Sequence, residues 1–243
     1  MTFQNCSLTD KPVTFRRFRM GKASQPVNLK QAWISEHPLV VIGVILAGCL
    51  GPFINKAIHE DDALFIWTAE WIQKHPTDFY GFGVNWWTST VPMWVANWNP
   101  PLMSYFLAGV AALFGCHEIV LHLACLVVAF AAATGIYALA QTWCGRPLLA
   151  TVVAIFTPAF LVSSTTLMCD VLMLTFWIWA LVLWERALAG SEQSWWRFAG
   201  AGALAGLAVL TKYNAVILLP LLPILSLLRT RKLGGGGWDW QCR

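Results

Sequence analysis

Carboxylates gather in the segment His59-Glu60-Asp61-Asp62, which follows the first long apolar run of the chain and precedes a tryptophan-rich loop. Charged groups this close to hydrocarbon are costly and often functional. The segment therefore predicts a working site at a membrane surface, with Asp61 and Asp62 as candidate residues. The alternative is a solvated helix start, where carboxylates favourably meet the helix dipole and free N–H groups.

Two more ionisable residues interrupt apolar sequence. Asp170 begins the apolar run 171–184, so its simplest role is to cap that helix with a side-chain oxygen. It can also face the site, through a divalent cation that prefers hard oxygen ligands. Lys212 divides the apolar stretch 198–228, and it is expected at a turn between two short spans where its ammonium group reaches water.

The elements that must position these residues are membrane helices. Hydrophobic residues make up 58% of the chain and charged residues 12%, and this balance, with long apolar runs, is typical of an integral membrane protein. We expect an all-α, polytopic transmembrane helix bundle with about six spans. The expected spans are 39–54, 119–140, 147–162, 171–184, 198–210 and 215–228.

A seventh apolar run, 101–114, is expected to lie in the membrane interface. With this assignment the basic clusters before the first span, at Arg146, between Arg186 and Arg197, and at 229–232 all fall on one side, which the positive-inside rule makes the cytoplasm. The amino terminus is then cytoplasmic. The four candidate residues Asp61, Asp62, Asp170 and Lys212 lie together on the outer face.

The chain divides into a basic cytoplasmic tail at 1–36, a transmembrane module at 37–228 with an outer loop at 55–117, and a short basic and glycine-rich tail at 229–243. Apolar residues at helical spacing in 62–73 predict an amphipathic helix parallel to the membrane. Tryptophans such as Trp67, Trp71, Trp86 and Trp87 suit an interfacial belt, with stacking against a sugar ring as the alternative. The net charge of +4 is accounted for by loops that meet anionic lipid, so no nucleic-acid partner is expected.

Four motifs in order carry a family resemblance. They are His59-Glu60-Asp61-Asp62-Ala63-Leu64-Phe65, Asn99-Pro100-Pro101-Leu102, Met168-Cys169-Asp170 and Leu210-Thr211-Lys212. This order resembles the amino-terminal half of the protein O-mannosyltransferase-like glycosyltransferases, which are family 39 within the C superfamily of integral membrane glycosyltransferases. The group includes the bacterial enzymes that transfer aminoarabinose to lipid A.

The resemblance implies transfer of a sugar from a polyprenyl-phosphate carrier to an acceptor hydroxyl of a lipid, glycan or protein, with inversion. Such a reaction needs a base for the hydroxyl proton and positive charge for the departing phosphate. By resemblance, Asp61 is the base, Asp62 binds acceptor or a cation, and Asp170 orients the phosphate-binding group. Lys212 and Asn99, which stands where relatives have His or Lys, contact the donor phosphate. Asp61 and Asp170 are the candidate ligands of any divalent cation.

The resemblance also implies a multi-pass protein of the bacterial inner membrane with a periplasmic site. Family members are considerably longer, and the end of this chain, with four successive glycines from Gly234, supplies no further span, which predicts a fragment or a frame-shifted product. Two alternatives to the enzyme stay open. One is an inactive binding or scaffold remnant of such an enzyme, and the other is a transporter or flippase subunit.

Overall fold

A computed structural model describes residues 36–86, 88–189 and 195–234, with side chains up to Arg229. The predicted basic tail therefore lies outside the described residues except for Glu36, as do Trp87 and the segment 235–243. The described elements from residue 37 onward belong to one unit. They are α2 (Pro38–Leu50), η1 (Gly51–Phe53), α3 (Asp62–Lys74), β1 (Gly83–Asn85), β2 (Thr90–Pro92), α4 (Met93–Ala96), α5 (Leu102–Phe114), α6 (Glu118–Trp143), α7 (Pro147–Ile155), α8 (Pro158–Ser163), α9 (Asp170–Ala189), α10 (Trp195–Thr211), η2 (Tyr213–Ile217) and α11 (Leu218–Gly234).

The apolar runs form helices, as expected. Two of them, α6 and α9, are long and apolar enough to cross a membrane by length and composition. Three shorter apolar helical segments accompany them, at Pro38–Phe53, Leu102–Phe114 and Tyr213–Arg229. A mostly helical fold is therefore confirmed, whereas the number of spans stays a prediction.

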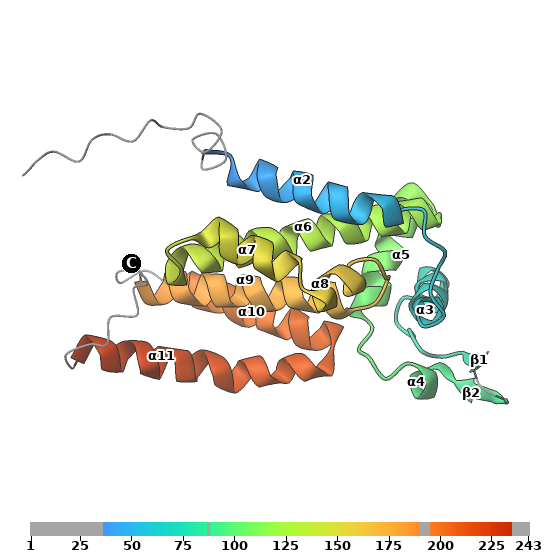
Figure 1. The fold of residues 1–243 in the computed structure, drawn as a ribbon. Coiled ribbons are helices and arrows are strands. Elements are labelled where there is room, and N and C mark those ends of the chain that lie inside the picture. Colours follow the sequence, from blue (N-terminus) through green and yellow to red (C-terminus); the bar gives the residue numbers. More distant parts are fainter. Residues whose placement is uncertain (1–35, 87, 190–194, 235–243) are drawn as a thin grey trace, which may run out of the picture. The chain divides into compact units, whose positions relative to one another are not determined.

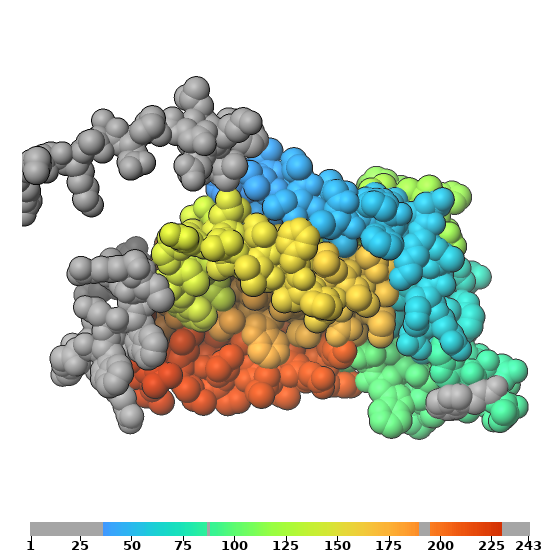
Figure 2. Space-filling model, viewed as in Figure 1, coloured from blue at the N-terminus to red at the C-terminus, as the bar shows by residue number. Residues whose placement is uncertain are grey.

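Successive long segments of this unit run in alternating directions. The segments α2, α6, α7 with α8, α9, α10 and α11 lie along one another, and each returns toward the end from which the previous one came (Figure 1). The helices α3 and α5 instead lie at one end of these segments. We call this the loop end, because the hairpin and α4 also lie there. Figure 2 shows α2 packed against the α7 segment on the visible face.

Short side chains bring α9 and α10 together. On α10, Ala201, Ala205 and Ala208 are completely buried. They recur at three- and four-residue spacing, so they share one face of the helix and let two backbones approach closely. This packing places the end of α10 beside the start of α9, where Lys212 and Asp170 lie.

The predicted span 147–162 is broken into α7 and α8. Thr157 adopts an extended backbone conformation before Pro158, and its hydroxyl accepts a hydrogen bond from the N–H of Phe160 at 3.4 Å. A proline at the first helical position disfavours a helical conformation in the residue before it. The predicted span 147–162 therefore consists of two short helices, and its crossing of a membrane stays a prediction.

The predicted amphipathic helix 62–73 corresponds to α3. Its apolar face contributes Phe65, Ile66, Ala69 and Ile72 to a buried cluster with Met103 and Leu107 of α5 and Leu121 of α6. The run 101–114 forms α5, which packs on α3 rather than running beside α9. Both helices lie at the loop end, and their placement in the membrane interface stays a prediction.

A small hairpin departs from the all-α prediction. Strands β1 and β2 pair antiparallel, with Val84 opposite Val91. Val84 packs with Leu64 of α3 and Met93 of α4 in a separate buried cluster. The hairpin therefore covers part of α3, and it forms one wall of a cleft described below.

Candidate functional site

The acidic segment folds as a tight turn into α3, and Asp62 is its buried member. The Asp62 side chain is only 1% exposed. One carboxylate oxygen accepts the N–H of His59 at 3.1 Å, and the other accepts the N–H of Leu167 at 3.0 Å. Asp62 thus ties the start of α3 to a turn 105 residues later in the chain.

The burial of Asp62 disfavours the charged form of its carboxyl group. Burial raises the pKa of the Asp62 carboxyl, while the hydrogen bonds from His59 and Leu167 and the electrostatic interactions with His59 and His122 lower it by a smaller amount. His122 on α6 is itself buried, and its Nε2 lies 2.9 Å from the carbonyl oxygen of Lys56. Asp62 therefore links two backbone segments, and its predicted binding of acceptor or a cation stays a prediction.

Asp61 contrasts with its neighbour, because it is exposed. Its backbone N–H donates to Nδ1 of His59 at 3.4 Å. Within the described part of the chain, its carboxylate takes part in no hydrogen bond or ion pair. Asp61 thus presents an unengaged carboxylate to solvent beside a rigidly held one.

Asp170 and Lys212 form an ion pair. Nζ of Lys212 lies 2.7 Å from a carboxylate oxygen of Asp170, and the two side chains are 25% and 33% exposed. Burial lowers the pKa of Lys212, but the hydrogen bond and charge of Asp170 outweigh it, so the pKa is raised. Lys212 therefore stays protonated at neutral pH. The Asp170 carboxylate binds this ammonium group instead of a free N–H of α9, so the predicted side-chain cap does not form.

The turn before α9 connects these two pairs of residues. Leu167 binds Asp62, and Asp170 follows three residues later at the start of α9. The buried side chains of Leu167 and Cys169 hold this turn in the same core cluster that contains Phe65 of α3. The structure thus brings Asp62 to the turn that carries Asp170 and, through it, Lys212.

Asn99 belongs to a polar group that sequence reasoning did not find. Its backbone N–H and its side-chain amide donate to Oδ1 of the buried Asn97, at 3.1 and 3.2 Å. The hydroxyl of Tyr80 donates to the carbonyl oxygen of Asn99. Burial, together with the nearby Tyr213 and Cys169, raises the pKa of the Tyr80 phenol. Tyr80 therefore lies near the residues adjacent to Lys212 and Asp170, which places Asn99 toward the same site.

The described side chains do not form a preassembled metal site. No group of three or more His, Cys, Asp or Glu side chains is placed to hold a metal ion among the residues that the structure describes. Asp170, one of the two candidate ligands, already binds Lys212. A divalent cation at Asp61 or Asp170 stays a prediction.

A comparison with protein families identifies the class to which the helices and the site belong. A family model described as dolichyl-phosphate-mannose-protein mannosyltransferase matches residues 98–234, which is more than half of the 243-residue chain. The match defines a membrane glycosyltransferase of the mannosyltransferase kind. The chain belongs to this dolichyl-phosphate-mannose-protein mannosyltransferase family. Searches among curated proteins and among solved structures gave no match.

The family resemblance seen in the motifs is therefore confirmed at the level of the family. The matched segment contains Asn99, Asp170 and Lys212, while Asp61 and Asp62 precede it. The closer relation to enzymes that modify lipid A stays a prediction.

Proposed function

We propose that the protein transfers a sugar from a polyprenyl-phosphate carrier to an acceptor hydroxyl at the outer face of the membrane, with inversion. One observation carries this proposal. The exposed, unengaged carboxylate of Asp61 and the hydrated Asp170–Lys212 ion pair lie at the loop end, linked through the turn that Asp62 binds. A base and a phosphate-binding cation are the two groups that such a transfer needs.

In the proposed reaction, Asp61 takes the proton of the acceptor hydroxyl. The acceptor oxygen attacks the anomeric carbon from the face opposite the phosphate, and a new glycosidic C–O bond forms. The bond between that carbon and the phosphate oxygen breaks, and its electron pair leaves with the polyprenyl phosphate. Attack from the opposite face inverts the anomeric configuration.

Lys212 stabilises the negative charge that develops on the phosphate. Its ammonium group has three N–H donors, and the bond to Asp170 uses one of them. Asp170 thus holds Lys212 in place and leaves donors for a phosphate. The Asn99 amide uses one of its two N–H groups on Asn97, so the second can reach a phosphate oxygen.

The distribution of charge supports an outer location for this site. Arg186 and Arg229 lie in the last turns of their helices, away from the loop end, and Arg197 donates to the carbonyl oxygen of Arg186 at 3.0 Å. Arg146 precedes α7 at the same end. By the positive-inside rule, this arginine-rich end faces the cytoplasm of an inner-membrane protein. The loop end then faces outward.

The test uses membranes that carry the full chain and a panel of polyprenyl-phosphate-linked hexoses and pentoses. Asp61→Asn should lower the release of polyprenyl phosphate by about 10²- to 10⁴-fold, because general base catalysis contributes that much. Glu60→Gln is the matched control, since it neutralises an adjacent exposed carboxylate. Release that persists in Asp61→Asn, or that falls equally in Glu60→Gln, would remove Asp61 from its proposed role.

A further inference from the structure

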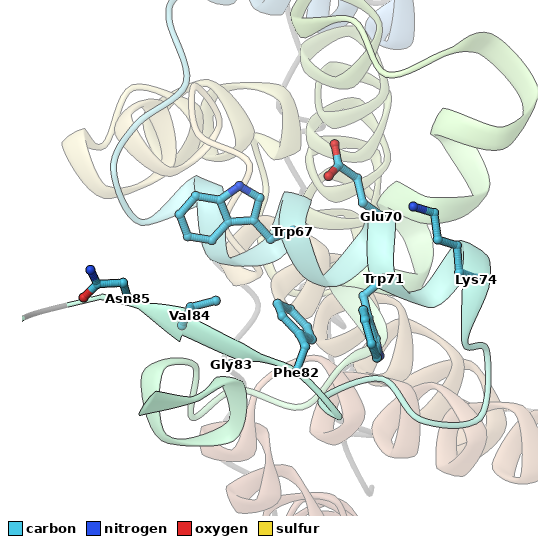
Figure 3. A pocket seen from close by; sticks show the side chains of 8 residues that line it. All are labelled: Trp67, Glu70, Trp71, Lys74, Phe82, Gly83, Val84 and Asn85. Atoms are coloured by element: carbon cyan, nitrogen blue, oxygen red, sulfur yellow. The ribbon is translucent and has the colours of Figure 1, made fainter. Parts of the chain in front are cut away.

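A cleft lies on the face of α3 that is turned away from the buried cluster. Its volume is about 500 Å³, within the range of about 300–1,000 Å³ that is usual for ligand pockets. Trp67, Glu70, Trp71 and Lys74 of α3 line one side, and Phe82 and Asn85 line the other (Figure 3). Neither the acidic turn nor the Asp170–Lys212 ion pair contributes to it.

The aromatic rings of the cleft divide into a fixed wall and an accessible platform. The Trp71 indole N–H donates to the carbonyl oxygen of Asp78 at 2.6 Å, and its ring stacks on Phe82 with centroids 5.1 Å apart. Trp67 instead meets Trp86 edge to face, with centroids 6.4 Å apart, and remains 41% exposed. Trp71 therefore shapes the cleft, while Trp67 has ring surface available to a ligand.

The charged residues of the cleft are available as well. Glu70 and Lys74 are exposed and four residues apart on α3, a spacing at which opposite charges commonly pair. In the described ranges, however, neither residue forms an ion pair or a side-chain hydrogen bond. The Glu70 carboxylate, which also lies near the Cys116 thiol, and the Lys74 ammonium group therefore have no ionic partner among the described side chains at the edge of this aromatic surface.

We propose that this cleft binds a sugar ring of a glycan acceptor, an inference that rests on the proposed transferase function. An aromatic ring covers the apolar C–H face of a sugar, and carboxylate, ammonium and amide groups bind its hydroxyls. Trp67 lies six residues after Asp61, which corresponds to about 9 Å along the helix axis. At this axial separation, a glycan of several units held against Trp67 can reach the proposed base, while the donor phosphate is held separately at Lys212.

The residues of the cleft favour this ligand over anchoring in lipid. Trp94 and Trp98, which do not line the cleft, are 63% and 77% exposed and suit the membrane interface. Trp67 is less exposed and lines the same cleft as Glu70 and Lys74, whose charges an acyl chain cannot satisfy. The cleft thus combines an aromatic ring with hydrogen-bonding groups, as sugar binding requires, whereas Trp94 and Trp98 present exposed rings that suit contact with lipid.

Binding is tested with the full chain in nanodiscs and no sugar donor, so that no turnover occurs. The probes are mannopentaose and cellopentaose in solution, and vesicles with or without galactosyl diacylglycerol. Saturation-transfer NMR for the oligosaccharides and vesicle co-flotation give the affinities. Trp67→Ala should weaken binding about 2- to 10-fold, as expected for loss of one aromatic contact. Trp94→Ala, the control for loss of an exposed tryptophan, should leave it unchanged.

The possible results of this binding experiment lead to different conclusions. Binding of an oligosaccharide that depends on Trp67 supports a free glycan acceptor, and Trp67-dependent binding of the glycolipid alone supports a glycolipid acceptor. The inference is overturned when no probe binds, or when Trp67→Ala binds as well as Trp94→Ala. Because no donor is present, this result is independent of the Asp61→Asn test, and failure of either one leaves the other interpretable.

Discussion

The two ends of α9 carry two ion pairs that differ in their access to water. At its first residue, Asp170 pairs with Lys212, and both side chains are a quarter to a third exposed. In its last turns, Glu185 pairs with Arg229 at 3.0 Å, and Glu185 is only 3% exposed. The two acidic residues are 15 positions apart, or about 22 Å along the helix.

The two pairs differ in how much it should cost to break them. Both members of the Asp170–Lys212 pair are partly exposed, whereas Glu185 in the other pair is buried. A partly exposed pair contributes roughly 0–1 kcal/mol and can open at little cost, which the proposed binding of a donor phosphate by Lys212 requires. Removing one partner of a buried pair leaves an uncompensated charge and is far more costly. A hydrogen bond of 2.9 Å from the Trp184 indole to the Ser226 hydroxyl further joins α9 to α11. The pair at the loop end is thus the more easily opened of the two, while the contacts at the opposite end join α9 to α11.

The largest effect expected from this comparison is on activity at the loop end. Lys212→Met should lower donor turnover by about 10²- to 10³-fold, the usual cost of removing one charge-stabilising group from a transition state. Lys212→Arg should recover part of it, because a positive charge remains. The measurement is the rate of polyprenyl phosphate release, with Arg229→Met as the control at the other end. Equal losses from Lys212→Met and Arg229→Met would erase the distinction between the two pairs.

The next effect is on stability at the opposite end. Arg229→Met should lower the free energy of unfolding by about 1–3 kcal/mol, less than for a fully buried pair because Arg229 is 40% exposed. Thermal unfolding in detergent measures this loss. Adding Glu185→Gln should restore much of it, since the unpaired buried charge is then removed. Lys212→Met should cost under about 1 kcal/mol in the same assay.

The sequence predicted secondary-structure elements better than it predicted tertiary contacts. The run 171–184 and the periodic segment 62–73 correspond closely to α9 and α3, because apolar periodicity records which faces avoid water. The hairpin at 83–92 was missed, since strands of three residues carry almost no alternation. The break at Thr157–Pro158 did leave a signal, because threonine before proline is a usual helix start.

The candidate site shows the same limit. Its four charged residues were found by type and by place in the chain, yet their partners depend on tertiary packing. Asp62 accepts a hydrogen bond from Leu167, 105 residues away. The capping role predicted for Asp170 is replaced by Lys212, whose position follows from the alanine face of α10. Local sequence favours a cap at the start of a helix, but it does not record which side chain a neighbouring helix brings there.

The smallest predicted effect concerns Asp62, which is buried like Glu185 although it lies at the loop end. Burial raises its pKa above the ordinary value of 3.8, so the folded state holds this proton more tightly than the unfolded state. The contribution of Asp62 to stability is therefore greatest below pH 3.8 and decreases as the pH rises through the raised pKa. Asp62→Asn, which does not titrate, should show a shallower fall in stability across that window.

The measurement is the difference in melting temperature between the wild-type protein and Asp62→Asn at a series of pH values from 3.5 to neutral, the starting value lying just below 3.8. The difference should move in favour of Asp62→Asn as the pH rises. Movement in the other direction would mean that the hydrogen bonds from His59 and Leu167 stabilise the carboxylate more than burial opposes it. In that case hydrogen bonding, and not exposure to water, would be the main difference between the Asp62 carboxylate and the exposed Asp61 carboxylate.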